Sequence, residues 1–263
     1  MRGLSVSIVL YCPDLALLEA TLGALERACG EAGVSPCLLL VDNDGRGQIL
    51  DDVAPLPADW RVKVLSGHGN VGFGAGHNLC LGALETYHLI LNPDLELAPD
   101  ALKNALFFLE SNPDCGLVVP SASWADGRVQ YLCKRMPTVF DLLLRGFAPA
   151  WLRSRFQERL ARYEMRDLIG ERVLWDPPIV SGCCMLFRSS VLQLLGGFDP
   201  RYFLYFEDFD LAIRAGARAR LAYLPSFRVV HHGGHAARKG WAHIGMFLRS
   251  AVIFFRKYGW RWF

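Results

Sequence analysis

The sequence predicts a single α/β domain built on a parallel, doubly wound sheet. Apolar runs that fit buried strands alternate with segments of helical spacing over residues 5–120, and this order favours parallel strands joined by helices. Polar and glycine-rich segments follow the strands, where sheets of this kind bind ligands. With 263 residues the chain is long enough for one large domain, and nothing in it requires a second.

In the first half of the chain, predicted strands alternate with predicted helices. Leucines at 15, 18, 22 and 25 recur at helical spacing, and the run LLLV at 38–41 stops at the turn sequence Asp-Asn-Asp-Gly. The predicted strands are 5–10, 38–41, 62–65, 88–91 and 115–120, and the predicted helices are 15–28, 77–87 and 99–110. Asp42 and Asp94 then fall at the carboxyl ends of strands.

Residues 121–178 interrupt this pattern, because prolines and glycines punctuate helical patches at 140–144 and 151–162. We interpret this stretch as an insertion over the sheet edge. The elements expected beyond it are strands at 183–187 and 228–230 and helices at 190–195, 209–216 and 241–258.

The sequence indicates a cytoplasmic protein. Residues 1–4 run directly into a strand and lack the apolar core and cleavage site of a secretory signal. The apolar stretch 246–255 is interrupted by Arg249, so no run reaches the roughly 20 residues that a spanning helix needs. The eight cysteines include no CxxC pair, and buried free thiols in a reducing compartment fit them better than disulfides or a zinc site.

The net charge of +2 is unevenly distributed. Residues 211–263 hold ten Lys or Arg and no Asp or Glu, interleaved with aromatics. This composition suits an interfacial helix on an anionic membrane, with 140–156 as a second contact. The alternative is that both segments pack on the domain or in a dimer. Nucleic acid is not an expected partner, because no recognised binding module is present.

The first chemical motif is Leu91-Asn92-Pro93-Asp94, a carboxylate directly after a strand. Such a carboxylate could bind Mg²⁺ together with the oxygens of a diphosphate. Asn-Pro-Asp is also an ordinary turn sequence, so the motif by itself leaves both interpretations open.

The second motif is the run GHGNVGFGAGHN at 67–78, which opens the predicted helix. Its glycines would let the backbone approach a ligand closely, while Asn70 and Asn78 offer amide groups to a ribose or phosphate. It fits neither a dinucleotide-binding fingerprint nor a P-loop. A flexible glycine loop is the alternative.

The third motif places Glu207, Asp208 and Asp210 among aromatics, shortly after Gly197-Phe198-Asp199. Clustered carboxylates repel one another unless they are partly solvated, paired or placed at a helix N-terminus. One of them could act as a general base toward a hydroxyl. A plain helix-capping cluster is the other interpretation.

The fourth motif is His231-His232-Gly233-Gly234-His235, directly after a predicted strand. An imidazole in this place could complete a metal shell or contact a phosphate, although many histidines have only structural roles.

Taken in order, these motifs resemble the family 2 glycosyltransferases of the GT-A fold, and their rhamnosyltransferase branch in particular. The resemblance extends over about residues 5–258. It rests on the motifs SIVLY, Val41-Asp42-Asn43, 70–78, 91–94, Ser181-Gly182, 197–199, 206–210 and 231–234.

The resemblance implies a Rossmann-like, doubly wound mixed sheet with helices on both faces and a C-terminal helical extension. It implies a nucleotide-binding half at about 1–120 and an acceptor-binding half at about 121–263. The activity it implies is inverting transfer of a sugar, rhamnose from dTDP-rhamnose or another sugar from a UDP donor. The acceptor would be a glycan or a polyprenyl-diphosphate-linked saccharide in cell-surface polysaccharide synthesis, reached at the inner face of the membrane.

The resemblance also assigns site residues. It gives nucleotide binding to Asp42, Asn43, Asn70, Gly72, Gly74, Asn78 and Asn92. Asp94 would be the main ligand of Mg²⁺ or Mn²⁺, with His231 at the metal or a phosphate, and Asp208 would be the catalytic base beside Glu207.

The chain departs from the family pattern in three places. Asn92 replaces the first carboxylate of an Asp-x-Asp motif, so metal affinity is expected to be modest. Cys12 stands where an asparagine is frequent, and His235-Ala236 replaces a serine or threonine after the histidine-glycine turn.

Two other functions are open to the residues alone. A sugar nucleotidyltransferase would carry a glycine-rich basic loop after the first strand, where this chain has Tyr11-Cys12-Pro13-Asp14. A non-catalytic sugar-nucleotide-binding module would be expected to lose its base, whereas Asp94 and Asp208 are both present.

Overall fold

The structure, a computed structural model, describes residues 3–45, 47, 50–233 and 241–263. Within them the main sheet comprises β1 Leu4–Leu10, β2 Cys37–Asp42, β3 Arg61–Leu65, β4 Tyr87–Leu91, β5 Leu95–Leu97, β6 Cys115–Ser123, β7 Val129–Gln130, β9 Leu174–Trp175, β11 Cys184–Arg188 and β12 Arg220–His231. A separate antiparallel pair is formed by β8 Cys133–Lys134 and β10 Ile179–Val180.

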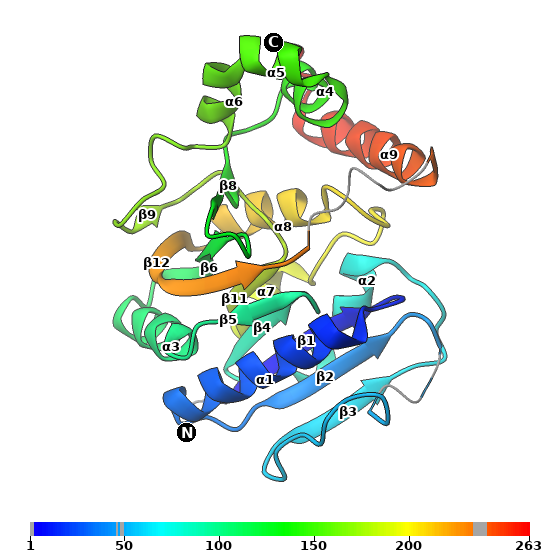
Figure 1. Ribbon diagram of the computed structural model, residues 1–263, viewed down its shortest axis with the longest axis vertical. Coiled ribbons are helices and arrows are strands. Elements are labelled where there is room, and N and C mark those ends of the chain that lie inside the picture. Colours follow the sequence, from blue (N-terminus) through cyan, green and yellow to red (C-terminus); the bar gives the residue numbers. More distant parts are fainter. Residues whose placement is uncertain (1–2, 46, 48–49, 234–240) are drawn as a thin grey trace.

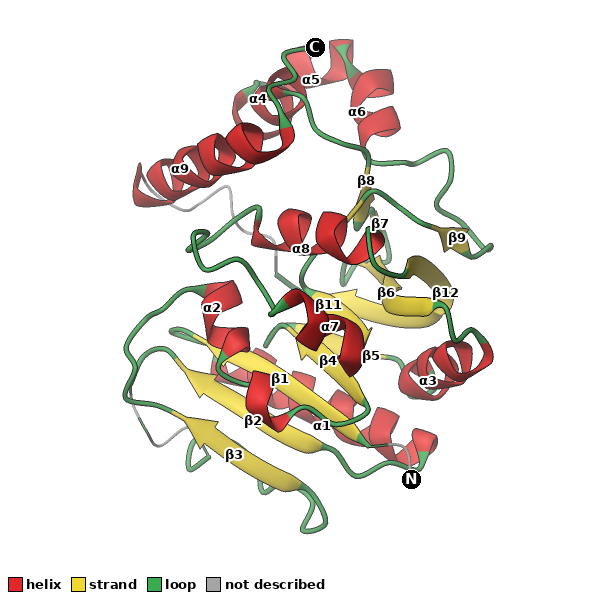
Figure 2. Ribbon diagram, turned by 180° about the vertical axis from the view of Figure 1, so that it is seen from behind, coloured by secondary structure: helices red, strands yellow, loops and turns green. Residues whose placement is uncertain are grey.

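The helices are α1 Leu15–Ala32, α2 Phe73–Asn78, α3 Ala101–Ser111, α4 Val139–Phe147, α5 Ala150–Arg155, α6 Gln157–Tyr163, α7 Ser189–Leu195, α8 Glu207–Gly216 and α9 Trp241–Tyr258, with a 3-10 turn at Leu81–Ala83. Helices α1 and α3 cover one face of the sheet, and α2 and α7 cover the other (Figures 1 and 2). Apolar cores fill both faces. The prediction of a doubly wound α/β sheet is therefore confirmed.

The sheet is mixed rather than parallel throughout. Its strands lie in the order β3-β2-β1-β4-β11-β6-β12-β5. Neighbours among β1 to β4 are parallel, as are β6 and β12, whereas β11 is antiparallel to both β4 and β6. Strand β11 follows the insertion rather than a crossover helix, and the regular alternation of the first half gives no sign of that reversal.

Three predicted elements differ from those observed. The helix expected at 77–87 is instead α2, which begins at Phe73, followed by the short 3-10 turn. Packing overrides the low helix propensity of its glycines, because a side chain at Gly74 would collide with Phe198 and one at Gly76 with Val9. The helix expected at 151–162 breaks at Phe156 into α5 and α6. The strand expected at 228–230 is the end of the long, bulged β12.

Helices α4, α5, α6 and α9 form a helical cap at the end of the molecule remote from β3 (Figure 1). The last residues of the chain tie this cap together. Val139 N–H donates to the Arg261 carbonyl over 2.8 Å, and the Phe140 and Phe263 rings stack with centroids 4.5 Å apart. The insertion and the C-terminal segment therefore form one packed unit.

The basic, aromatic segment at the C-terminus packs on the domain over part of its length. Phe254 and Phe255 are buried in the core beneath α9. Lys257 Nζ lies 2.5 Å from an Asp210 carboxylate oxygen, and Tyr258 donates to the same oxygen over 2.8 Å. Trp262 and Phe263 remain exposed. Arg238 and Lys239, in the same basic segment, lie outside the described residues.

All eight cysteines lie in the described part of the chain. Seven are buried and Cys12 is exposed. None of the helices that the structure describes is both long and apolar enough to cross a membrane.

Candidate active site

The topology brings four predicted motifs to one end of the sheet. Because β11 runs antiparallel to β4, its first residue Cys184 pairs with Leu91, the last residue of β4. Residues 181–183 therefore lie beside 92–94, and Asn92 N–H donates to the Cys183 carbonyl over 2.9 Å. On the other side His231 pairs with Leu95 across β12 and β5. Residues far apart in sequence thus meet around Asp94.

Asp94 and His231 face each other at this edge. The Nε2 atom of His231 lies 3.4 Å from Oδ1 of Asp94, and the backbone N–H of His232 donates to the Asp94 carbonyl over 2.9 Å. A side chain at Gly233 would overlap the Asp94 carboxylate, which explains a glycine at that position. His235 lies outside the described residues.

Gln130 fixes the tautomer of His231. Its amide nitrogen donates to the His231 carbonyl over 3.0 Å, so its amide oxygen faces Nδ1 of the same residue at 2.8 Å. Since that oxygen can only accept, Nδ1 carries the proton. The Trp124 ring stacks parallel to the imidazole, with centroids 6.3 Å apart. Nε2 is therefore the ring atom that faces Asp94, and in the neutral imidazole it offers a lone pair.

This arrangement fits a divalent cation. Oδ1 of Asp94 is buried and has no hydrogen-bond partner among the described residues, and the atom that faces it, Nε2 of His231, is a second acceptor when the imidazole is neutral. A cation between them would satisfy both, and one carboxylate with phosphate oxygens is a usual Mg²⁺ site. The described residues contain no cluster of three or more His, Cys, Asp or Glu that could hold a metal. Ligands from a bound diphosphate would therefore be needed to complete the shell.

Asp208 is held rigidly at the N-terminus of α8. Its Oδ2 accepts the Gly182 N–H over 2.8 Å, and its Oδ1 accepts the Phe209 N–H over 2.9 Å. A Cβ on Gly182 would lie 2.8 Å from that of Asp208. Tyr205 and Phe206, just before the helix, both have positive φ angles, a costly conformation for such residues that is found most often at functional sites.

The first two of the three carboxyl groups in the first turn of α8, those of Glu207 and Asp208, have different environments. Burial, and then the charge of Asp208, raise the pKa of Glu207 well above its usual value, and its buried Oε2 has no partner among the described residues. Burial also raises the pKa of Asp208, but the N–H groups of Gly182 and Phe209 oppose the rise. Burial therefore favours the neutral acid more strongly at Glu207 than at Asp208, whose carboxylate the two N–H groups stabilise.

Both ends of this site open on one cavity of about 690 Å³. Glu207, Asp208 and His231 line it together with Gln130 and Ser181. Burial raises the pKa of the neighbouring Cys183 thiol to about 12, and the carboxylates of Asp94 and Asp208 both contribute. Asp94, His231 and Asp208 therefore lie around the same short segment, while their roles as metal ligands and base stay predictions.

The residues predicted to bind nucleotide form a hydrogen-bonded group at the ends of β2 and the glycine-rich run. Asp42 is fully buried and its carboxylate accepts three N–H groups of its own loop, from Asp44, Gly45 and Gly47. Asn43 donates to the Asn70 side chain and to the Gly72 carbonyl. These contacts set the shape of the loop; contact with a nucleotide stays a prediction.

The remaining members of that set have clear contacts with protein. Both amide atoms of Asn78 bind the backbone of Phe198, each over 2.8 Å. Gly72 must lack a side chain because a Cβ would collide with the Phe203 carbonyl, and Gly74 packs against Phe198. Asn92 has a buried Oδ1 without a partner in the described structure. Gly72 and Gly74 thus allow close approach of protein atoms, whereas the sequence suggested close approach of a ligand.

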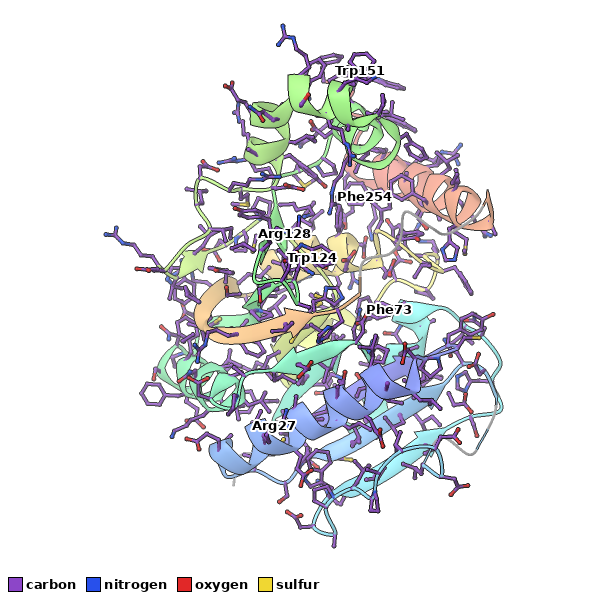
Figure 3. The ribbon with its side chains drawn as sticks, viewed as in Figure 1. Arg27, Phe73, Trp124, Arg128, Trp151 and Phe254 are labelled. Carbon is purple, nitrogen blue, oxygen red and sulfur yellow. The ribbon has the colours of Figure 1, made fainter. Side chains whose placement is uncertain are left out.

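Sequence reasoning missed several residues of the cavity wall. Gln130 and Trp124 support His231, and Lys134, Arg145 and Arg166 line the same cavity. Figure 3 shows Trp124 and Arg128 near each other between the sheet and the helical cap. Gln130 lies 101 positions from its partner, so no local pattern could have identified it.

Comparisons with known proteins identify relatives of this chain. A scan of protein-family models finds none that matches. The chain is 32% identical to the N-acetylglucosaminyl-diphospho-decaprenol L-rhamnosyltransferase of Mycobacterium tuberculosis, over 98% of this chain and 86% of that protein. It is 27% identical to rhamnosyltransferase WbbL of Escherichia coli K12, over 65% of this chain and 64% of the relative.

Among solved structures, the fold is similar to that of mannosyltransferase PcManGT from Pyrobaculum calidifontis, determined with GDP-mannose and Mn²⁺. The TM-score is 0.62 at 18% identity, covering 96% of this chain and 64% of the other. At this identity the likeness concerns the fold alone.

Proposed function

Because the chain belongs to the family 2 glycosyltransferases with the GT-A fold, we propose that it transfers rhamnose from dTDP-rhamnose to a hydroxyl of a polyprenyl-diphosphate-linked acceptor. The M. tuberculosis relative is an L-rhamnosyltransferase whose acceptor is an N-acetylglucosaminyl-diphospho-decaprenol, and the E. coli relative is also a rhamnosyltransferase. Together they favour rhamnose as the sugar and a lipid-linked saccharide as the acceptor.

One observation carries this proposal: Asp208 lines the same cavity as His231, and His231 Nε2 lies 3.4 Å from Oδ1 of Asp94. A transferase must bind the leaving diphosphate at one point and deprotonate the incoming hydroxyl at another, on opposite sides of one carbon atom. The cavity offers a cation site at the sheet edge and a fixed carboxylate on α8. A non-catalytic binding module would need no such base.

The reaction we propose is a single in-line displacement with inversion. The acceptor oxygen forms its bond to the anomeric carbon while the bond from that carbon to the diphosphate oxygen breaks, and the hydroxyl proton passes to Asp208. The Gly182 and Phe209 N–H groups hold Asp208 in place for this step, and its raised pKa makes it a stronger base than an ordinary aspartate. Mg²⁺ or Mn²⁺ held by Asp94 and His231 would stabilise the charge of the departing diphosphate.

We assign the donor to the half of the chain before about residue 120 and the acceptor to the half after it. Asp42, Asn43 and Asn70 would contact the nucleoside, and Asn92 the donor near the cation. Gly72, Gly74 and Asn78 would act by shaping the loop, because their contacts are with protein atoms.

We further propose that the helical cap lies against an anionic membrane on its cytoplasmic face. Large apolar side chains are exposed there, among them Phe147, Trp151, Trp262 and Phe263, and Figure 3 shows Trp151 at the outer end of the cap. Arg153 and Arg155 on α5 are exposed beside them. Aromatic and basic side chains together are typical of interfacial segments. Co-sedimentation with vesicles that contain or lack anionic lipid tests this contact.

The proposed activity is tested by incubating the protein with dTDP-rhamnose, Mn²⁺ and N-acetylglucosaminyl-diphospho-polyprenol, and analysing the lipid product by mass spectrometry. Addition of one deoxyhexose is expected, with none in chelator. Asp94→Ala should weaken metal-dependent binding of dTDP without unfolding the protein. Transfer of a different sugar from a UDP donor, with none from dTDP-rhamnose, would contradict the assigned donor.

A further inference from the structure

The wall of the catalytic cavity that faces the helical cap is basic. Lys134, Arg145 and Arg166 line it, from β8, α4 and the segment after α6. Arg145 and Arg166 also line an adjoining cavity of about 500 Å³, together with Arg153 of α5. A continuous path of positive charge therefore runs from the neighbourhood of Asp208 to the outer surface of the cap.

The positive charge on this path exceeds its negative charge. Glu164 is the carboxylate shared by the two cavities. It accepts from Arg166 over 2.6 Å and lies 3.5 Å from Arg145. One carboxylate thus faces two arginines, and the outer cavity adds Arg153 without adding an acidic lining residue. An excess of guanidinium groups around a concave surface suits a phosphate or diphosphate.

Lys134 places another cation deep in the same wall. Only 5% of the residue is exposed, and its Nζ donates to the Tyr131 carbonyl over 2.7 Å. Burial, and then the charge of Arg145, lower its pKa to about 7. A buried ammonium group beside an arginine opposes folding, so an anion from outside the chain would relieve the repulsion.

We infer that Lys134, Arg145, Arg166 and Arg153 bind the diphosphate of a lipid-linked acceptor. This inference rests on the proposed function. The features follow one another in the same order as the parts of such a molecule. Asp208 would meet its reacting hydroxyl, the inner cavity would hold its sugar, and the basic wall would bind its diphosphate. Leu143, Phe147 and Trp151, exposed on the cap, are placed to meet its polyprenyl chain.

The diphosphate of the sugar donor could also bind to a basic wall, but the geometry favours the diphosphate of the acceptor. The candidate cation site lies at the β5 and β12 edge, with Asp94 and His231. The basic wall comes from β8, α4 and the segment after α6, and Figure 1 shows β8 and α4 above β5 and β12, toward the end of the molecule that carries the helical cap. A cation-held diphosphate needs Mg²⁺ or Mn²⁺, whereas arginines bind a diphosphate without any metal.

Farnesyl diphosphate and farnesol are suitable probes, titrated in chelator so that the donor cation site stays empty. The full-length protein should bind farnesyl diphosphate and bind farnesol much more weakly. Arg153→Gln should weaken the binding of farnesyl diphosphate about ten-fold, since a charge-assisted hydrogen bond is lost. The double variant Arg145→Gln with Arg166→Gln should weaken this binding further. Arg155→Gln is the matched control, because Arg155 lies on the same helix and lines neither cavity.

Equal affinity for the two probes, or equal effects of Arg153→Gln and Arg155→Gln, would overturn the inference. Binding that appears only with Mn²⁺, and is lost in Asp94→Ala, would assign the diphosphate to the donor site and overturn it too. These titrations involve neither donor nor turnover. Binding at the basic wall without rhamnosyl transfer would therefore refute the proposed function alone. Transfer to an alkyl N-acetylglucosaminide without binding of farnesyl diphosphate would refute this inference alone.

Discussion

The Nε2 atom of His231 lies 3.4 Å from Oδ1 of Asp94, although 136 residues separate them in the chain. Gln130 holds a proton of His231 on Nδ1, so with a neutral imidazole two acceptor atoms face each other at the sheet edge. A cation is the simplest partner for such a pair. A cation held there would lie beside the cavity that His231 and Asp208 both line.

The assignment of Asp208 as base predicts a selective loss of turnover. Asp208→Asn keeps an oxygen to accept the Gly182 N–H but cannot take a proton, so kcat should fall about 10²–10⁴-fold. Donor affinity should change little. Glu207→Gln is the matched control: burial raises the pKa of Glu207 and so favours its protonated form, which glutamine imitates, and kcat should stay within about ten-fold of wild type. Near-normal transfer by Asp208→Asn, measured beside donor titration, would remove Asp208 from this role.

Gln130 is predicted to act on metal binding through His231. Gln130→Leu removes the acceptor that fixes Nδ1–H, and loss of such a supporting partner typically weakens a metal site about 10–100-fold. Calorimetric titration of Mn²⁺ in the presence of dTDP measures this. Val129→Thr, the exposed neighbour on β7, serves as the control. If Gln130→Leu binds Mn²⁺ as tightly as wild type, His231 is not a ligand oriented by Gln130.

Much of this site could be predicted from the sequence, because strand ends are visible in it. Asp94 follows a buried strand and Asp208 begins a helix, and both positions follow from local patterns. The contacts that hold these residues in place could not be predicted. The antiparallel insertion of β11 and the contact between Gln130 and His231 depend on pairing over long sequence separations.

The glycine-rich run illustrates a second limit. Its composition indicates close approach of the backbone to something, without saying to what. The structure identifies the neighbours of Gly72, Gly74 and Gly76 as Phe203, Phe198 and Val9. Lys134 is a comparable case, since a lysine between Cys133 and Arg135 has no local mark of burial.

Lys134 is predicted to reduce stability in the free protein. Burial, and then the charge of Arg145, lower its pKa to about 7. Glu164, Cys133 and Asp208 oppose this lowering but do not cancel it. The unfolded chain therefore holds the proton more tightly than the folded one. The resulting cost is complete below pH 7 and diminishes as the pH rises toward the value of a free lysine, about 10.4.

Lys134→Met should therefore raise the melting temperature by about 2–4 °C near pH 6, with a smaller gain at pH 9. Differential scanning calorimetry at both pH values measures this. Lys103→Met, a lysine exposed on α3 and paired with Glu31, is the control and should give no gain. A lower melting temperature for Lys134→Met at pH 6 would show that the ammonium group stabilises the fold.

A buried pair of histidines sets the acid limit of stability. His88 bonds Ser5 and Ser7 over 2.8 and 2.9 Å, and His77 bonds Ser7 over 2.7 Å. Burial lowers the pKa of His88 to about 3 and that of His77 well below its usual value. Both are neutral when folded, so the unfolded state gains protons first as the pH falls.

Stability should accordingly decline below about pH 6.5, by about 2 kcal/mol for each histidine at pH 5. Urea unfolding of wild type and His88→Gln between pH 5 and 8 tests the effect. The variant should show a shallower decline than wild type across that range. Parallel curves for the two proteins would exclude His88 as a source of the pH dependence.

The central claim is that one cation bridges Asp94, His231 and a donor diphosphate in the cavity that Asp208 lines. Anomalous X-ray scattering at the manganese edge, from crystals grown with Mn²⁺ and dTDP, locates that cation directly. The account predicts a single strong peak within bonding distance of a carboxylate oxygen of Asp94 and of Nε2 of His231. A peak bound elsewhere, or dTDP bound in the cavity without manganese beside Asp94, would contradict it.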